Sequence, residues 1–398
     1  MLLGGMVKFR FWERTQTLFN RLSGWVGVDL RYFIKGGFWL SLPFVVNSLL
    51  GIARSILFAR LLSKEVYGQF GFVNDTISTL AFLTLPGLTS ALVETVARGN
   101  RGAIFDARHA RLRWGVLLTL SAFGFSLYYL WKGEHALALA ISLAGLLQPL
   151  SSTYNLVHGY YQGVKRFDQD SYLNMGQSVV NTGGIILILL LKKGLVWLIV
   201  ANYGTNLIYY LIIYLVTTRD LKTKPRDPEV VAYGRALTWA NLIMTISTSL
   251  DGFVLGITGD FVEVAVYRVA STFPKSAKTP ILSLRPLVLP KIAERPEKKI
   301  YTAQVRKQLG VLFLLNLLFA GCIMGLIYLF LPVIYGETYR GAIVYGQLLM
   351  LSLVMGWPDA FFVAALQARK QTRAISYANM VYGILLISSM LILTPVWG

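Results

Sequence analysis

The sequence predicts an all-α membrane protein that crosses the bilayer many times. Of its 398 residues, 55% are hydrophobic and only 14% are charged, whereas soluble domains typically carry about 25% charged residues. The mean hydropathy is +0.57, and apolar runs close to the roughly 20 residues that span a bilayer recur along the whole chain. Because no soluble domain fits between these runs, we expect the chain to be a polytopic membrane protein throughout.

Eleven apolar segments are predicted to cross the membrane as helices. In chain order they cover residues 36–58, 70–96, 114–131, 136–157, 173–191, 195–217, 236–257, 262–290, 310–331, 341–366 and 375–394. Most of the 38 Lys and Arg residues then lie on one side of the membrane, and the other side holds only Arg60, Lys64, Lys132, Lys192, Lys193 and Arg340. Since basic loops stay in the cytoplasm, the pattern predicts a multi-pass protein of the plasma membrane with a cytoplasmic N-terminus.

Two polar stretches divide the chain. Residues 1–35 mix basic and aromatic residues, which is typical either of a helix on the cytoplasmic leaflet or of a basic tail. Residues 218–235 form a predicted cytoplasmic linker between two lobes. The N-lobe, residues 36–217, has six predicted spans, and the C-lobe, residues 236–398, has five, without a twelfth.

The two lobes show a faint repeat at an offset of about 197 residues, which aligns Arg54 with Asp251 and Asp75 with Thr272. The second span of each lobe is long and contains prolines, in the sequence LPGL at 85–88 and then at positions 274, 280, 286 and 290. Corresponding interrupted helices in two halves of a chain indicate a transporter with its site between the halves.

Five cations fall within predicted spans, where a charge at the bilayer centre costs about 2.5 to 3.5 kcal/mol. They are Arg54, Arg268, Lys275, Lys278 and Arg285. On a helix the last four lie within an arc of roughly 100°, so they can line one water-filled cavity that receives an anionic group. The alternative is that the two arginines of this span reach toward the membrane surfaces while the two lysines mark an unwound break.

Two aspartates, Asp75 and Asp251, are predicted to lie at about the depth of Arg54 and Arg268. One interpretation is that these four residues form ion pairs that close an outer gate, and a second is a static link between the lobes. A third is that an aspartate binds a coupling Na⁺ or proton, with further oxygens from Asn47, Asn74 and Asn241. Apart from such an ion, no cofactor or metal is predicted.

The sequence contains no pattern that predicts an enzyme. His109, His135 and His158 lack the spacing of metal ligands, and no phosphate-binding loop for ATP is present. The net charge of +19 is what basic cytoplasmic loops produce, so nucleic acid is not an expected partner.

Two stretches carry a family resemblance. Residues 49–92 contain Ala59-Arg60-Leu61-Leu62 followed by Tyr67-Gly68, and residues 266–294 begin near Tyr267-Arg268 and reach Leu289-Pro290. Both resemble the polysaccharide transporter family, the O-antigen flippases of the multidrug/oligosaccharidyl-lipid/polysaccharide exporter superfamily. The resemblance implies two pseudo-symmetric helical lobes around a central cavity, with about 11 to 12 transmembrane helices.

This family moves polyprenyl-diphosphate-linked oligosaccharides, precursors of O-antigen, capsule or exopolysaccharide, from the cytoplasmic to the outer leaflet by alternating access. The resemblance therefore implies that Arg54, Lys275 and Lys278 hold phosphate, with Arg268 above them. It also implies membrane lipids and other polysaccharide-assembly proteins as partners.

Four other functions stay open at this point. A multidrug exporter of the same superfamily should have an acidic cavity, and a lipid II flippase generally has an arginine just after the LP of span two, where this chain reads LPGLTSA. A membrane glycosyltransferase would need paired carboxylates near a substantial outer loop, and a scaffold without transport activity would lack a cavity.

Overall fold

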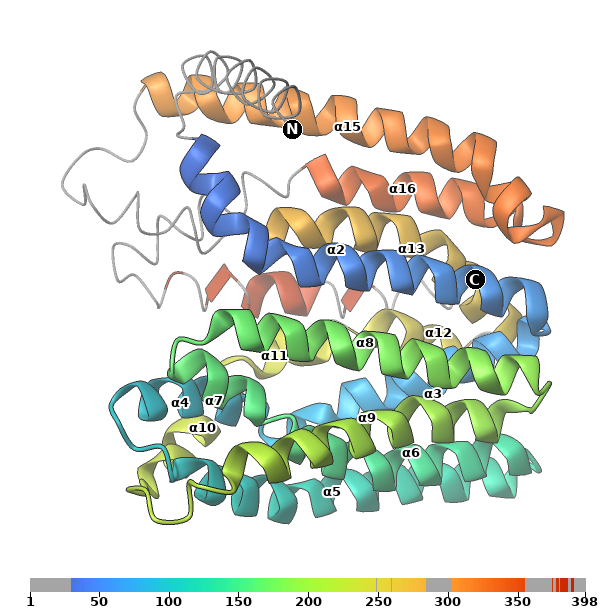
Figure 1. Ribbon diagram of the computed structural model, residues 1–398. Helices are drawn as coiled ribbons and strands as arrows, with labels where there is room; N and C mark the ends of the chain where they lie inside the picture. The colour runs from blue at the N-terminus through green and yellow to red at the C-terminus, as the bar shows by residue number, and fades with distance from the viewer. Residues whose placement is uncertain are drawn as a thin grey trace, which may run out of the picture.

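The computed structural model describes residues 30–283 and 303–354, apart from Thr248 and Gly259, together with scattered positions between 374 and 389. This part of the chain is nearly all helical and contains no strand. Figure 1 shows long helices that run roughly along one direction and are joined mostly by short connections. The prediction of an all-α polytopic membrane protein is confirmed.

The described elements follow one another with few residues between them. In the first half they are α2 (Leu30–Leu61), α3 (Lys64–Leu80), η1 (Ala81–Thr84), α4 (Gly87–Ala97), α5 (Ala103–Trp131), α6 (His135–Tyr154), α7 (Val157–Gly163), α8 (Phe167–Leu190) and α9 (Leu195–Thr218). In the second half they are α10 (Glu229–Ala240), α11 (Leu242–Ser247), α12 (Leu250–Thr258), α13 (Phe261–Ser283), α15 (Ala303–Tyr335), η2 (Glu337–Tyr339) and α16 (Ala342–Val354).

Length and composition qualify six of these helices as membrane spans, or seven if the bent pair Lys64–Thr84 and Gly87–Ala97 counts as one, among the residues described. Large apolar side chains such as Leu120, Leu187 and Leu215 are exposed on their outer faces. Exposed apolar faces on helices of this length are what a lipid environment requires.

The predicted interruption of the second span lies at Leu85 and Pro86. Leu85 has a left-handed backbone with φ 56°, and the axis bends by 46° between η1 and α4. Proline has no N–H to continue the helical hydrogen bonds, so the carbonyl groups near it need other donors. The N–H groups of Leu85, Leu88 and Thr89 supply them, to the carbonyl oxygens of Phe82, Leu85 and Pro86. Arg111 of α5 also donates to the carbonyl oxygen of Leu85, at 3.1 Å, and joins it to that of Ser152 on α6, at 2.9 Å.

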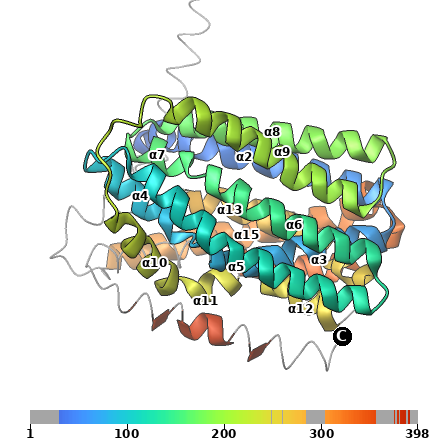
Figure 2. The same ribbon diagram turned by 90° about the horizontal axis from the view of Figure 1, so that it is seen from below.

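The spans of the second half differ from the sequence prediction in where they break. The segment predicted as one span at 236–257 is divided, and Figure 2 shows α10, α11 and α12 following one another along one side of the bundle. By contrast, α13 continues without a break through Pro274 and Pro280. The prediction of an interruption at these two prolines, and of an unwound break at the lysines beside them, is therefore wrong. Pro286 and Pro290 lie outside the described residues.

The first two spans form the contact between the halves. Helix α2 lies between α8 and α13 (Figure 1), α3 packs against α12 and α13, and α4 packs against α10. The bundle thus has two ends, which we call the linker end, with residues 219–228, and the Arg60 end, with the turn between α2 and α3. The site described below lies within the α2–α3–α13 contact.

Candidate functional site

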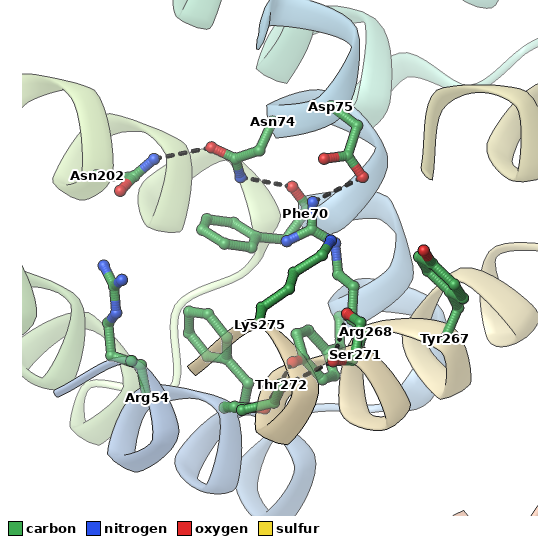
Figure 3. Close-up of a pocket in the computed structure, with 14 residues that line it drawn as sticks. Arg54, Phe70, Asn74, Asp75, Asn202, Tyr267, Arg268, Ser271, Thr272 and Lys275 are labelled. Carbon is green, nitrogen blue, oxygen red and sulfur yellow. Dashed lines mark hydrogen bonds and ion pairs between the residues drawn. The ribbon is translucent and has the colours of Figure 1, made fainter. Parts of the chain in front are cut away.

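A cavity of about 330 Å³ opens between α2, α3, α9 and α13. Figure 3 shows that its wall is built from polar and charged side chains of both halves, with a few aromatic rings. The lining residues are Gly51, Arg54, Ser55, Phe58, Tyr67, Phe70, Asn74, Asp75, Asn202, Tyr267, Arg268, Ser271, Thr272 and Lys275. A polar cavity inside a membrane bundle marks a path for a substrate or an ion.

Arg54 enters the cavity from α2 and has a neutral partner. Its Nη1 donates to Oδ1 of Asn181 on α8 at 2.7 Å, and no carboxylate of the described residues lies within ion-pair distance of it. Because a carboxamide does not neutralise a guanidinium, Arg54 keeps its positive charge available to a bound anion.

Arg268 enters from α13 and, unlike Arg54, has an acidic partner. Its Nη2 lies 2.8 Å from Oδ2 of Asp75 and donates to the carbonyl oxygen of Gly71 at 2.7 Å. Two glycines make room for this pair. A Cβ at Gly252 would lie 1.8 Å from Oδ2 of Asp75, and a Cβ at Gly71 would lie 2.2 Å from Nε of Arg268. The ion pair therefore joins α3 to α13 at a point where only glycine fits around it.

Lys275 lies one turn further along the cavity face of α13 than Ser271. Its Nζ is 3.6 Å from Oδ2 of Asp251 on α12 and lies over the ring of Tyr267, whose hydroxyl donates to the same carboxylate. The Lys275 side chain is 62% exposed, against 25% for Arg268. Lys275 is thus the cavity cation most open to a ligand among the described residues.

The structure brings five of the predicted site residues together, namely Arg54, Asp75, Asp251, Arg268 and Lys275. The sequence repeat aligned Arg54 with Asp251, but in the structure Asp251 pairs with Lys275, and Asp75 pairs with Arg268. Lys278 lies on α13, with its side chain outside what the structure describes, and Arg285 lies outside it altogether.

The three asparagines considered for a coupling ion lie in different surroundings. Asn74 lines the cavity, where its Oδ1 accepts from Asn202 at 2.9 Å. Asn47 donates to Oδ1 of Asn174 at 2.6 Å, and Asn241 donates to the carbonyl oxygen of Leu237 in its own helix.

Sequence reasoning named Asn74 but missed most of the other neutral polar residues of the site. Asn181 and Asn202 hold Arg54 and Asn74. The hydroxyl of Ser55 meets those of Tyr67 at 3.1 Å, Thr272 at 3.0 Å and Tyr335 at 3.2 Å, so one group joins α2, α3, α13 and α15. Polar residues at helical spacing within apolar segments were the available signal.

Fold and site together define a multi-pass membrane protein with a charged cavity between two halves. The chain matches the family described as "Polysaccharide biosynthesis protein" over residues 33–278, more than half of its length, and it belongs to this family. The resemblance found in the sequence is thereby confirmed. Comparison with curated proteins gave no match.

Solved structures show the same fold. An inward-facing multidrug resistance MATE family transporter of the MOP superfamily is similar with a TM-score of 0.59 and 17% identity, covering 87% of this chain and 84% of that one. The MATE multidrug transporter DinF-BH has a TM-score of 0.58, 15% identity, and coverage of 92% and 90%. An outward-facing MATE family transporter has a TM-score of 0.55, 20% identity, and coverage of 91% and 86%. The chain thus has the fold of a MOP-superfamily transporter.

Proposed function

We propose that the protein is a flippase, which moves a polyprenyl-diphosphate-linked oligosaccharide from the cytoplasmic to the outer leaflet of the plasma membrane. The observation that carries the proposal is Arg54, a cavity guanidinium held by an amide with its charge uncompensated by the described residues. Arg54 and the exposed Lys275 face one cavity. Guanidinium and ammonium groups are the usual protein partners of phosphate, and membership of the family supports this class of substrate.

The ion pairs give this proposal a mechanism of alternating access. The Asp75–Arg268 pair joins the two halves, whereas Asp251 and Lys275 both belong to the second half. A diphosphate that enters the cavity competes with Asp251 for Lys275 and with Asp75 for Arg268. Because binding then weakens the link between α3 and α13, the substrate itself favours separation of the halves on that side. In this role Asp75 and Asp251 are gate residues.

Several parts of the proposal rest on the sequence. Lys278 and Arg285 extend the cationic face of α13, the N-terminus lies in the cytoplasm, and membrane lipids surround the prenyl tail. Coupling to Na⁺ or protons at Asp75 or Asp251, and contact with other polysaccharide-assembly proteins, are further elements of it. The protein acts as a transporter and not as an enzyme.

A multidrug exporter is the second candidate, because the similar solved structures include multidrug transporters. The charge of the cavity argues against it. Its two carboxylates, Asp75 and Asp251, already have cationic partners, whereas Arg54 has a neutral one. An organic cation would therefore meet net positive charge. A lipid II flippase remains the third candidate, and the head group that is bound distinguishes it.

Native mass spectrometry of the gently solubilised protein tests the substrate class. We expect a co-purified polyprenyl-diphosphate glycolipid, and we expect Lys275→Gln/Lys278→Gln to lose it while the variant still folds. Lys132→Gln, in a loop away from the cavity, is the matched control and should keep the lipid. Binding of organic cations to the pure protein, with only ordinary phospholipids co-purified, would contradict the proposal.

A further inference from the structure

A row of carboxamide side chains on α2, α3, α8 and α9 begins beside Arg54, and on α2 and α8 it continues toward the linker end. We call this row the amide ladder, and it consists of Asn47, Asn74, Asn174, Gln177, Asn181, Asn202 and Asn206. Asn181 accepts from Arg54 and donates to the carbonyl oxygen of Asn202 at 2.8 Å. Further along, Asn47 donates to Asn174 at 2.6 Å and Gln177 donates to Asn206.

Two members of the ladder, Asn74 and Asn202, line the cavity, and on α2 Asn47 lies one turn beyond the lining residue Gly51. Asn47, Gly51 and Arg54 lie on one face of this helix, at spacings of four and three residues. Gly51 lines the cavity, and a Cβ placed on it would have open space around it. From Asn47 to Arg54 the ladder extends over seven residues, which is about 10 Å along the helix. That length accommodates a sugar next to a phosphate group held by Arg54.

The ladder is uncharged. Each carboxamide offers one acceptor oxygen and two N–H donors, which together match a sugar hydroxyl that both donates and accepts. The nearest carboxylate on α8, Asp170, is held by His158 at 2.5 Å and by Gln162. Arg54 is the one cation that contacts the ladder among the residues described. If Arg54 holds the phosphate, no other cation among the described residues contacts the ladder to neutralise the carboxylate of an acidic sugar.

One acceptor of the ladder has no donor. Oδ1 of Asn47 is buried and has no hydrogen-bond partner among the described residues. A buried acceptor normally has a partner, and a ligand hydroxyl would supply it. If Asn47 served only to link α2 to α8 through Asn174, its Oδ1 would not need to stay without a donor.

From these observations we propose that the amide ladder binds the first sugar after the diphosphate, and that this sugar is uncharged, with hydroxyl or acetamido groups. The proposal rests on the proposed function, since it assumes that Arg54 holds the diphosphate. It adds the chemical class of the sugar and the direction in which the glycan lies, from Arg54 toward the linker end.

Binding of three lipids to the full-length protein in nanodiscs tests the ladder. They are a polyprenyl diphosphate without sugar, the same lipid with one N-acetylhexosamine, and the same lipid with one hexuronic acid. The unmodified protein should prefer the N-acetylhexosamine lipid. The double variant Asn174→Leu/Gln177→Met should bind that lipid about tenfold more weakly, because it loses one or two hydrogen bonds to the sugar. Its affinity for the sugar-free lipid should stay the same.

Two controls separate the possible failures. Lys275→Gln should weaken binding of all three lipids, because it acts on the phosphate, and Val179→Ala, on the exposed face of α8, should change none. Equal binding of the sugar-free and N-acetylhexosamine lipids, or preference for the hexuronic acid, would overturn the ladder while leaving the flippase proposal intact. Absence of binding of any lipid to the unmodified protein would overturn both. The preference of the unmodified protein decides the matter even if the double variant does not fold.

Discussion

At the scale of single residues, the two cavity arginines have different partners. Arg268 pairs with Asp75 in a space that glycines provide, while Arg54 is held by an amide. A paired arginine stabilises the contact between helices, whereas an arginine with a neutral partner is available to a ligand. The same type of side chain is therefore paired on α13, where a ligand must displace Asp75, and has a neutral partner on α2.

Breaking the Asp75–Arg268 pair should destabilise the protein. Asp75→Asn leaves Arg268 without its counter-charge in a mostly buried position, which typically costs about 3 kcal/mol or more. Thermal unfolding in detergent would measure the loss. The double variant Asp75→Asn/Arg268→Gln should recover much of it, since neither charge is then left alone. Strictly additive losses in the two single variants would contradict the pairing.

Five charged residues singled out from the sequence lie at or beside the cavity, because a cation or an aspartate inside an apolar span is conspicuous. The sequence could not reveal which acid meets which base. That pairing depends on how α12 and α13 pack against α3, and the repeat only aligned Arg54 with Asp251 as equivalent positions of the two lobes. Asn181 gave no such signal, since a single amide in an apolar segment has many ordinary roles.

At the scale of helices, the bend of the second span depends on Arg111. This residue is 3% exposed and donates to carbonyl oxygens on both sides of the break, and also to the hydroxyl of Thr89. The sequence LPGL was sufficient to predict the break, because proline removes a donor. It did not predict the contacts that Arg111 adds from another helix.

Replacing Arg111 should therefore loosen this bend. Arg111→Met removes the side-chain hydrogen bonds to Leu85, Thr89 and Ser152 from a buried position, so we expect a loss of about 2 to 3 kcal/mol in the free energy of unfolding. Arg113→Met, an exposed position on the same helix, should change it by less than about 0.5 kcal/mol. Hydrogen exchange of α4 would report the bend directly. Equal exchange in the two variants would show that Arg111 does not support it.

At the scale of the whole molecule, the halves are tied together at both ends. At the Arg60 end, Nε of Arg60 donates to the carbonyl oxygen of Ile334 at 2.7 Å, and Nζ of Lys64 to that of Thr338 at 2.5 Å. At the linker end, the N–H of Gly87 on α4 donates to Oγ1 of Thr238 on α10 at 3.0 Å. Alternating access requires that the contact at the Arg60 end open and close during transport.

Cross-linking across the Arg60 end should consequently stop transport. Cysteines at Lys64 and Thr338, in a Cys322→Ser background, can be joined by a short bismaleimide. We expect transport to fall to background after cross-linking and to remain normal with either single cysteine treated in the same way. Full transport by quantitatively cross-linked protein would contradict the movement of the halves at this end.

Flippase activity is tested most directly in proteoliposomes. The measurement is the rate at which a polyprenyl-diphosphate glycan crosses the bilayer, followed with an enzyme that acts only on the outer leaflet. The unmodified protein should accelerate this movement. Arg54→Gln and Lys275→Gln should each reduce the rate at least about tenfold, because each removes a proposed contact with the phosphate. Lys132→Gln, which lies away from the cavity, should leave the rate unchanged. A rate equal to that of protein-free liposomes would show that the protein does not move this lipid. A rate unchanged by both Arg54→Gln and Lys275→Gln would show that these residues do not hold its phosphate.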